Sequence, residues 1–221
     1  LRDTGRVRTV VAADFDNDGR EELFFNASGE ANRLFARRDA TARNESGERG
    51  SDGARWRRID PGPAAEPDGF GTGAVAADID GDGVLELIVV HGEVAGQPIS
   101  VYKDPTAAAA GWVRVRPTTR HGAPARGAVV RLETADGVQR RTVDAGGGCL
   151  CQTEPVAHFG LGGATPIRID VRWPDGRERT LTDPAPNAEL AVEHPSLTAA
   201  STERRRGRGH ADSGDGRTVG R

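Results

Sequence analysis

The sequence lacks long apolar runs, and it is poor in several residue types. No window of 18 apolar residues occurs among its 221 residues, so nothing in it predicts a membrane span. Lys103 is the one lysine beside 29 arginines, a bias that we interpret as a coding preference rather than a binding surface. The net charge of −3 argues against nucleic acid as a partner, because such domains are usually basic over a whole face.

Methionine is absent altogether, and the sequence opens at Leu1 in a strand-like segment with no recognisable signal peptide. We therefore expect a piece of a longer protein, with any export signal upstream. The length is sufficient for one large domain or two small ones, each with a hydrophobic core.

Cysteine is almost absent as well. Cys149 and Cys151, in GGGCLCQ, are the only two. A C-x-C pair supplies half of a tetrahedral zinc site, and no Cys or His cluster nearby supplies the other half. We expect neither zinc nor redox catalysis here; whether either cysteine is a buried thiol or pairs outside this chain stays open.

Carboxylates, in contrast, are concentrated in two nearly identical stretches, VAADFDNDGREELFF from Val11 and VAADIDGDGVLELIV from Val75. Both place acids at alternate positions and a Gly after the third Asp, where a loop around an ion must turn sharply. The predicted metal ligands are the side chains of Asp14, Asp16, Asp18 and Glu22 with the carbonyl of Arg20, and the side chains of Asp78, Asp80, Asp82 and Glu86 with the carbonyl of Val84.

Calcium is the predicted cofactor, since it accepts six to eight oxygens flexibly whereas magnesium prefers stricter octahedra. An EF-hand is excluded, because Phe25 and Val89 stand where its twelfth-position Glu belongs. The flanking residues are also typical of strands rather than helices. Acidic turns between strands remain the alternative to a metal site.

A strand, an acidic loop and a second strand, repeated after 64 residues, predict an all-β blade array. We expect propeller blades in residues 1–108, with a long surface excursion from Ala36 to Gly69 and a further strand from Ile99. Residues 111–195 predict a small antiparallel β domain with hairpins at Asp136-Gly137 and Asp175-Gly176. Ile167, Ile169, Val171 and Trp173 are expected on one face of its last hairpin, and residues 196–221 are expected to be disordered.

The acidic stretches DFDNDGREE and DIDGDGVLE resemble the calcium loops of FG-GAP/VCBS repeats, which form propeller blades in integrin alpha subunits. GAPARGAVVRLETADG, EPVAHFGLG and VRWPDGR resemble the ASPIC/UnbV domain, and the order of the two is that of the cartilage acidic protein family. Where that family has Tyr in a G-S-G-Y-L-C stretch, this chain has Cys149, so local packing there is expected to differ. No cysteine follows to supply the EGF-like module of vertebrate members.

This resemblance implies a secreted, calcium-binding glycoprotein of the extracellular matrix or cell surface that binds other proteins and is not an enzyme. Asn26-Ala27-Ser28 and Asn44-Glu45-Ser46 are candidate glycosylation triplets in loop-like contexts. The alternative is a carbohydrate-active or other hydrolytic enzyme with its active site on N-terminal blades outside this chain. His158, in EPVAHFGLG, has no accompanying nucleophile motif and is expected to be structural, as is His91.

Overall fold

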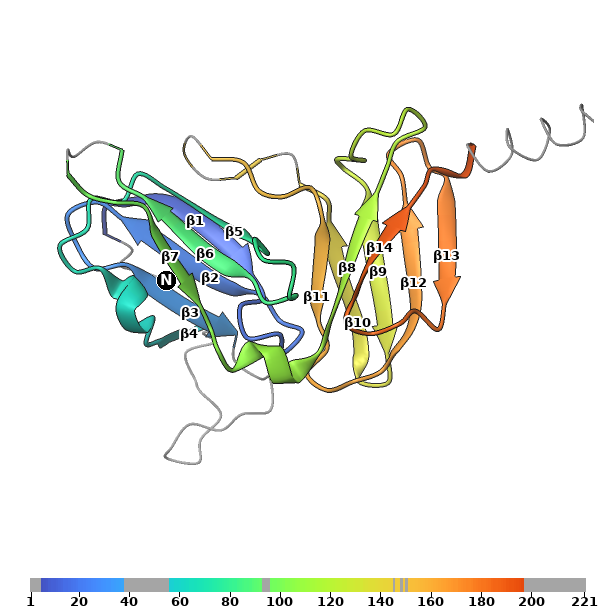
Figure 1. Ribbon diagram of the computed structural model, residues 1–221, viewed down its shortest axis with the longest axis horizontal. Helices are drawn as coiled ribbons and strands as arrows, with labels where there is room; N and C mark the ends of the chain where they lie inside the picture. Colours follow the sequence, from blue (N-terminus) through green and yellow to red (C-terminus); the bar gives the residue numbers. More distant parts are fainter. Residues whose placement is uncertain are drawn as a thin grey trace, which may run out of the picture.

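The computed structural model describes residues 5–37, 56–92, 96–144, 146–147, 149 and 151–196, and they form an all-β architecture of four sheets. Two sheets belong to an N-terminal half, residues 5–103, and two to a C-terminal half, residues 111–196 (Figure 1). The predicted all-β class is confirmed at this level. The tail expected to be disordered lies, beyond Ser196, outside the described residues.

The first sheet is a four-stranded antiparallel meander in chain order. Its strands are β1 (Val7–Ala13), β2 (Glu22–Ala27), β3 (Arg33–Arg37) and β4 (Trp56–Ile59). In β1 the inward positions alternate with exposed ones, the period expected of a strand with one buried face. Phe24 of β2 is fully buried in the core that this sheet shares with the second.

The expected surface excursion from Ala36 to Gly69 was partly wrong, because it contains strand β4 and the 3-10 helix η1 (Gly62–Ala65). Trp56 and Ile59 are half-buried while the two arginines between them are exposed. This short arginine-rich segment lacks a clear apolar alternation, so its strand character comes from pairing with β3. Residues 38–55 of the excursion lie outside the described part of the chain.

The second sheet comprises β5 (Gly73–Ala77), β6 (Glu86–Val90) and β7 (Ser100–Lys103), all antiparallel. Strand β7 confirms the further strand expected from Ile99. Strands β1 and β5 lie side by side (Figure 1), and the two sheets bury one shared apolar cluster. Its buried members are Val11, Ala13, Phe24, Ala64, Ala74, Ala76, Leu85, Leu87 and Val89.

The C-terminal half consists of a four-stranded and a three-stranded sheet around a separate core. Its strands are β8 (Trp112–Pro117), β9 (Val129–Thr134), β10 (Gly137–Thr142), β11 (Ala157–Gly160), β12 (Pro166–Arg172), β13 (Glu178–Thr182) and β14 (Ala188–Val192). The expected purely antiparallel arrangement was wrong, because β14 pairs with β8 in parallel. A parallel pair requires a long crossover, and the intervening chain supplies it by forming β11 of the same sheet and the four strands of the other sheet.

Both predicted hairpins are present. Strands β9 and β10 pair Thr134 with Gly137, and β12 and β13 pair Arg172 with Glu178 around Asp175-Gly176. One face assignment was wrong: Ile167 is 44% exposed, whereas Ile169 and Val171 are fully buried. The register of β12 against β9 shifts between Pro166 and Arg168, and such a bulge turns the next side chain to the other face.

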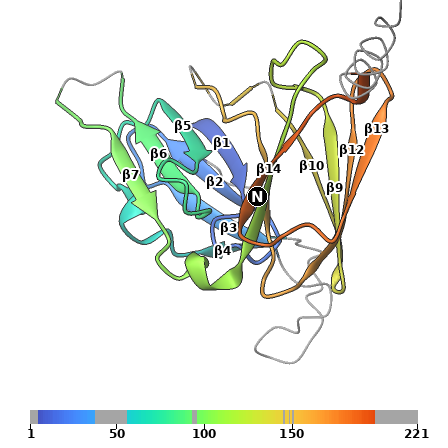
Figure 2. The ribbon, with the colours of Figure 1, turned by 45° about the vertical axis from the view of Figure 1, so that its right-hand side comes forward.

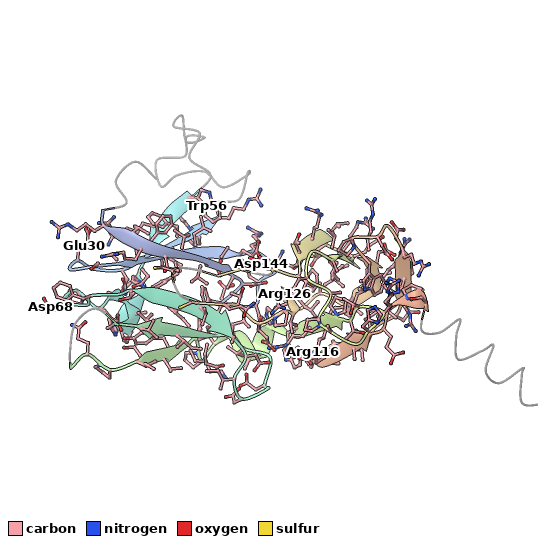
Figure 3. The ribbon with its side chains drawn as sticks, turned by 90° about the horizontal axis from the view of Figure 1, so that it is seen from above. Glu30, Trp56, Asp68, Arg116, Arg126 and Asp144 are labelled. Carbon is pink, nitrogen blue, oxygen red and sulfur yellow. The ribbon has the colours of Figure 1, made fainter. Side chains whose placement is uncertain are left out.

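The two halves are joined through the 3-10 helix η2 (Ala107–Ala110), which lies below the junction in Figure 1. Turning the molecule by 45° keeps the two pairs of sheets adjacent (Figure 2). Seen from above, Glu30 and Asp68 lie at the far end of the N-terminal half, whereas Asp144 and Arg116 lie toward the junction (Figure 3). The acidic stretches predicted as metal sites are loops at this junction.

Candidate metal centre

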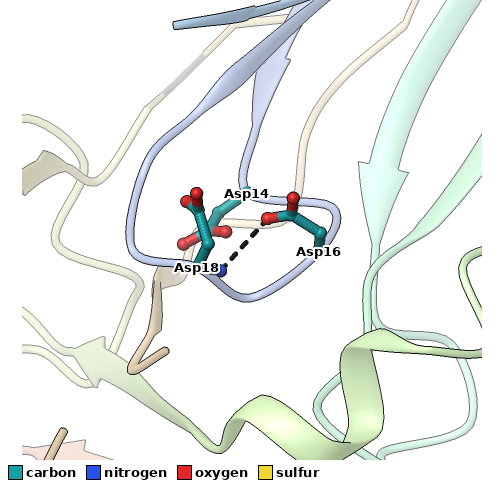
Figure 4. Close-up of side chains that lie close together, drawn as sticks. All are labelled: Asp14, Asp16 and Asp18. Carbon is teal, nitrogen blue, oxygen red and sulfur yellow. Dashed lines mark hydrogen bonds between the residues drawn. The ribbon is translucent and has the colours of Figure 1, made fainter. Parts of the chain in front are cut away.

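The first acidic loop, residues 14–22, connects β1 to β2. One carboxylate oxygen each from Asp14, Asp16 and Asp18 lies within 4.8 Å of the others. Figure 4 shows these side chains and the 3.1 Å hydrogen bond that the Asp18 backbone N–H donates to Asp16. Gly19 has φ +94°, a conformation that favours glycine, and its N–H donates to Asp14 Oδ2 at 3.0 Å.

Two carboxylates of this loop are buried. Asp14 is 2% exposed and Glu22 is 3% exposed. Burial, followed by repulsion from neighbouring acids, raises the pKa of Asp14 to about 7 although Arg141 opposes the shift. Burial and repulsion from Asp16 raise the pKa of Glu22 to about 8. The loop therefore holds its carboxylates where their negative charge is unfavourable without a cation.

A hard divalent cation fits this donor set. Calcium binds oxygens at about 2.3–2.6 Å, so two of its ligand oxygens can lie up to about 5 Å apart, in agreement with the observed 4.8 Å limit. Asp14 Oδ1 is buried and has no hydrogen-bond partner among the described residues. A buried carboxylate oxygen without a partner is costly, and coordination to an ion would remove that cost.

The second acidic loop, residues 78–86, connects β5 to β6 and repeats the internal hydrogen bonds of the first. Gly83 N–H donates to Asp78 Oδ2 at 3.0 Å, as Gly19 does to Asp14. Ile79 N–H donates to Glu86 Oε2 at 2.8 Å, and Phe15 donates to Glu22 in the same way at 3.0 Å. The second loop thus has the same backbone frame, with Asp78, Asp80 and Glu86 as its close oxygen group.

Two predicted side-chain ligands, Asp82 and Glu22, lie outside these close oxygen groups. Asp82 Oδ1 accepts the N–H of Val84 at 2.9 Å, as Asp18 Oδ1 of the first group accepts the N–H of Arg20 at 2.7 Å. The carbonyls of Arg20 and Val84 remain predicted ligands. Glu22 stays a predicted ligand as well, since its carboxylate is close enough to Asp16 to raise its pKa.

The two loops differ in the positively charged side chains that contact them. The Lys103 ammonium, at the end of β7, lies 2.8 Å from Asp80 Oδ2, 2.8 Å from Asp82 Oδ1 and 2.5 Å from Glu86 Oε1. Partial burial opposes its charge, but the contacts with these three carboxylates raise the pKa of Lys103. The sole lysine of the sequence is therefore part of the second acidic loop's environment, and the coding-bias interpretation missed it.

The C-terminal half packs directly against both loops. Gly160 N–H donates to the buried Asp14 Oδ2 at 3.0 Å, and the Arg141 guanidinium lies 3.8 Å from the same oxygen. Arg114, itself 2% exposed, contacts Asp78 Oδ2 at 2.6 Å. A cavity of about 370 Å³ between the halves is lined by Asp14, Arg114 and Arg141 among others. Each loop thus presents its first Asp to an arginine of the other half.

Asn17 joins the loops to each other and to the C-terminal half. Its side-chain N–H groups donate to the carbonyls of Gly83 and Ala107 at 3.0 and 3.3 Å, which fixes the orientation of the amide. Its Oδ1 therefore accepts, at 2.7 Å, from His158 Nε2. Burial and the nearby Arg114 lower the pKa of His158 to about 3, so the ring is neutral and makes a structural contact.

Sequence reasoning predicted a structural His158 but missed Asn17. The signal was present in the repeat itself: Asn17 corresponds to Gly81, and both have positive φ, 57° and 76°. Glycine is the ordinary choice for that conformation. An Asn in its place indicates that the amide has a partner, and here it has three.

Other predicted positions fall as follows. Asn26, expected in a loop, is fully buried within β2, so the first glycosylation triplet is not accessible. Asn44 of the second triplet lies outside the described residues.

Cys149 is an exposed free thiol and Cys151 is a half-buried free thiol, and burial raises the pKa of Cys151. His91 Nε2 contacts Glu66 at 2.8 Å, which gives it a structural role. No helix in the described ranges is long and apolar enough to cross a membrane.

Comparison with known proteins agrees with the division of the chain into an N-terminal and a C-terminal half. Residues 14–89 match the FG-GAP-like repeat, and residues 118–199 match the family ASPIC and UnbV. The chain is therefore a protein in which an FG-GAP-like repeat precedes an ASPIC and UnbV domain.

Over 196 residues, 86% of the chain, it is 45% identical to cartilage acidic protein 1 of Mus musculus and of Homo sapiens, and 43% identical to that of Xenopus tropicalis. The domain order and this identity confirm the resemblance to the cartilage acidic protein family. The chain spans 29%, 28% and 29% of the length of these three relatives.

Proposed function

We propose that the two acidic loops bind calcium as structural ions, in propeller blades that carry the C-terminal half. The observation that carries this is the first loop, where buried Asp14 has one oxygen without a partner and Glu22 is buried among other acids. Bound calcium would be coordinated by these carboxylates and would neutralise the loop. Folding and metal binding are then coupled, so calcium stabilises the native state.

The blade assignment rests on sheet topology and on the FG-GAP-like match. A four-stranded antiparallel meander is the form of a propeller blade, and the second sheet packs beside it through strand β5. This chain spans less than a third of the length of its relatives. We therefore propose that its two sheets are part of a closed ring and do not form one by themselves. Upstream blades would complete the ring.

At the level of the whole protein, we propose a secreted, non-enzymatic interaction protein of the extracellular matrix or cell surface. The relatives are named for cartilage, a tissue rich in extracellular matrix. Extracellular calcium modules of modest affinity, roughly 10⁻⁴ to 10⁻³ M, would be loaded outside the cell. His158 supports the non-enzymatic assignment, because its Nε2 is held by Asn17.

Isothermal calorimetry on the folded chain tests the metal sites. We expect two calcium equivalents for the parent and one for Asp80→Ala, because Asp80 contributes to the second oxygen group. Asp175→Ala, in a hairpin of the C-terminal half, is the matched control and should keep both equivalents. A folded parent that binds no calcium would leave acidic turns as the correct interpretation.

A further inference from the structure

The second acidic loop contains a cation supplied by the chain itself. The Lys103 ammonium contacts three carboxylates, of Asp80, Asp82 and Glu86, at 2.5–2.8 Å. The ammonium donates hydrogen bonds to both oxygens of Asp80, at 3.0 and 2.8 Å, and forms ion pairs with Asp82 and Glu86. Lys103 is held there by the sheet, since β7 pairs it with Glu86 directly across from β6.

The first acidic loop has no counterpart to this lysine. Leu23 pairs with Phe35 in the first sheet as Leu87 pairs with Tyr102 in the second. One step further along, the place of Lys103 is therefore taken by Ala36, which is buried and uncharged. Within the described part of the chain, Asp16, Asp18 and Glu22 form no ion pair, and the buried Asp14 Oδ1 has no hydrogen-bond partner.

We propose that Lys103 is the resident counter-ion of the second acidic loop, so that calcium enters this loop only by displacing the ammonium, after it has filled the first. The proposal rests on the proposed function and makes the two sites unequal. Its physical basis is competition: a calcium ion and an ammonium cannot contact the same three oxygens, and the two cations repel each other.

Displacement is sterically possible. The Lys103 side chain is 27% exposed, and Asp80 and Asp82 are more exposed still, at 61% and 48%. A flexible four-carbon stem at such a site can swing into solvent. Calcium must then replace three ion pairs of Lys103 in the second loop. In the first loop no lysine occupies the corresponding place, so calcium has no ammonium to displace.

The sole lysine of the chain makes a selective probe. Protein labelled with ¹³C at lysine Cε, without lysines added at its ends, gives one side-chain signal, and calcium chloride is titrated against it. We expect this signal to differ from free lysine at the start and to stay in place during the first calcium equivalent. It should move to the free position only when a second, weaker equivalent binds.

A free-lysine signal before calcium is added would overturn the proposal, as would a shift during the first equivalent. Calorimetry on Lys103→Met, which keeps the length of the stem without its charge, supplies the second measurement. The affinity of the second loop should rise by about tenfold or more, since a repelling charge is removed. Lys103→Arg, which keeps a cation, should leave that affinity low.

These outcomes separate the two hypotheses. Two sites of equal affinity that Lys103→Met does not change would refute the role of Lys103 and leave calcium binding intact. No calcium bound by the folded parent at either loop would refute the proposed function. In that case the proposal about Lys103 still requires Lys103→Met to create a site in the second loop, and a folded variant without one would refute it as well.

Discussion

Replacing Asn17 by Ala removes a fully buried side chain that joins the first acidic loop to the second and to the C-terminal half. Three hydrogen bonds are lost, to Gly83, Ala107 and His158. At a net value of about 1 kcal/mol each, their loss costs about 3 kcal/mol. Ala at φ +57° adds about 1 kcal/mol, because its Cβ disfavours the left-handed conformation. We expect Asn17→Ala to lower the free energy of unfolding by about 4 kcal/mol.

Asn17→Gly is the matched variant, because it reproduces the residue that stands at the equivalent position, Gly81. It loses the same hydrogen bonds without the backbone cost, so its destabilisation should be smaller by about 1 kcal/mol. Urea unfolding followed by tryptophan fluorescence measures both variants, with saturating calcium and with chelator. The order Ala, Gly, parent in rising stability separates the backbone contribution from that of the hydrogen bonds.

The variants also have a local signature. In the parent, the Asn17 amide orientation requires the proton of neutral His158 to be on Nε2. Nitrogen NMR of the histidine rings should show this tautomer, and Asn17→Ala should abolish its strong preference. A loss of stability below about 1 kcal/mol in both variants, with an unchanged His158 signal, would show that Asn17 does not join the two halves.

Three further predictions concern the ion-free protein, the C-terminal half and the cysteines. In chelator, Asp14 and Glu22 bind protons in the folded state at a pH where the unfolded chain, with pKa values of 3.8 and 4.5, has released them; stability should therefore fall as pH rises from about 4 to about 8, and saturating calcium should remove that slope. A flat stability profile in chelator would contradict these raised pKa values. Residues 111–195 contain their own core and no acidic loop, so this segment alone should show the same thermal midpoint with calcium and with chelator, and a shift of many degrees would refute its independence. Metal analysis should find zinc well below one equivalent, and stoichiometric zinc that is lost when Cys149 and Cys151 are both changed to Ser would overturn that expectation.

The sequence was sufficient to predict what is encoded locally. The acidic loops were recognisable because their carboxylates and their glycines follow one another within nine residues, and the backbone frame that results is the same in both. Ile169 and Val171 were placed correctly because alternation fixes the face of a strand. Ile167 was misplaced because a register shift depends on the neighbouring strand β9, which the sequence of β12 does not contain.

The contacts between the two halves could not be predicted in the same way. Asn17 and His158 are 141 residues apart, and neither residue type indicates a partner at that distance. Arg114 is one of the many arginines of the sequence and lies in a strand of alternating residues. Only the folded chain shows that its guanidinium reaches Asp78. Long-range polar pairs of this kind are decided by how the halves dock, and local pattern carries no information about docking.

The family motif EPVAHFGLG acquires a physical explanation from this docking. His158 donates to Asn17, and Gly160 N–H donates to Asp14 while Gly162 N–H donates to the carbonyl of Asn17 at 2.8 Å. A Cβ on Gly160 would lie 2.4 Å from the Asn17 backbone, so a side chain there would push the first acidic loop away. The motif is thus a surface of backbone donors shaped to a carboxylate loop. Because Asp14 is both a predicted ligand and the acceptor of Gly160, we expect calcium binding at the first loop and the docking of the C-terminal half to depend on the same carboxylate.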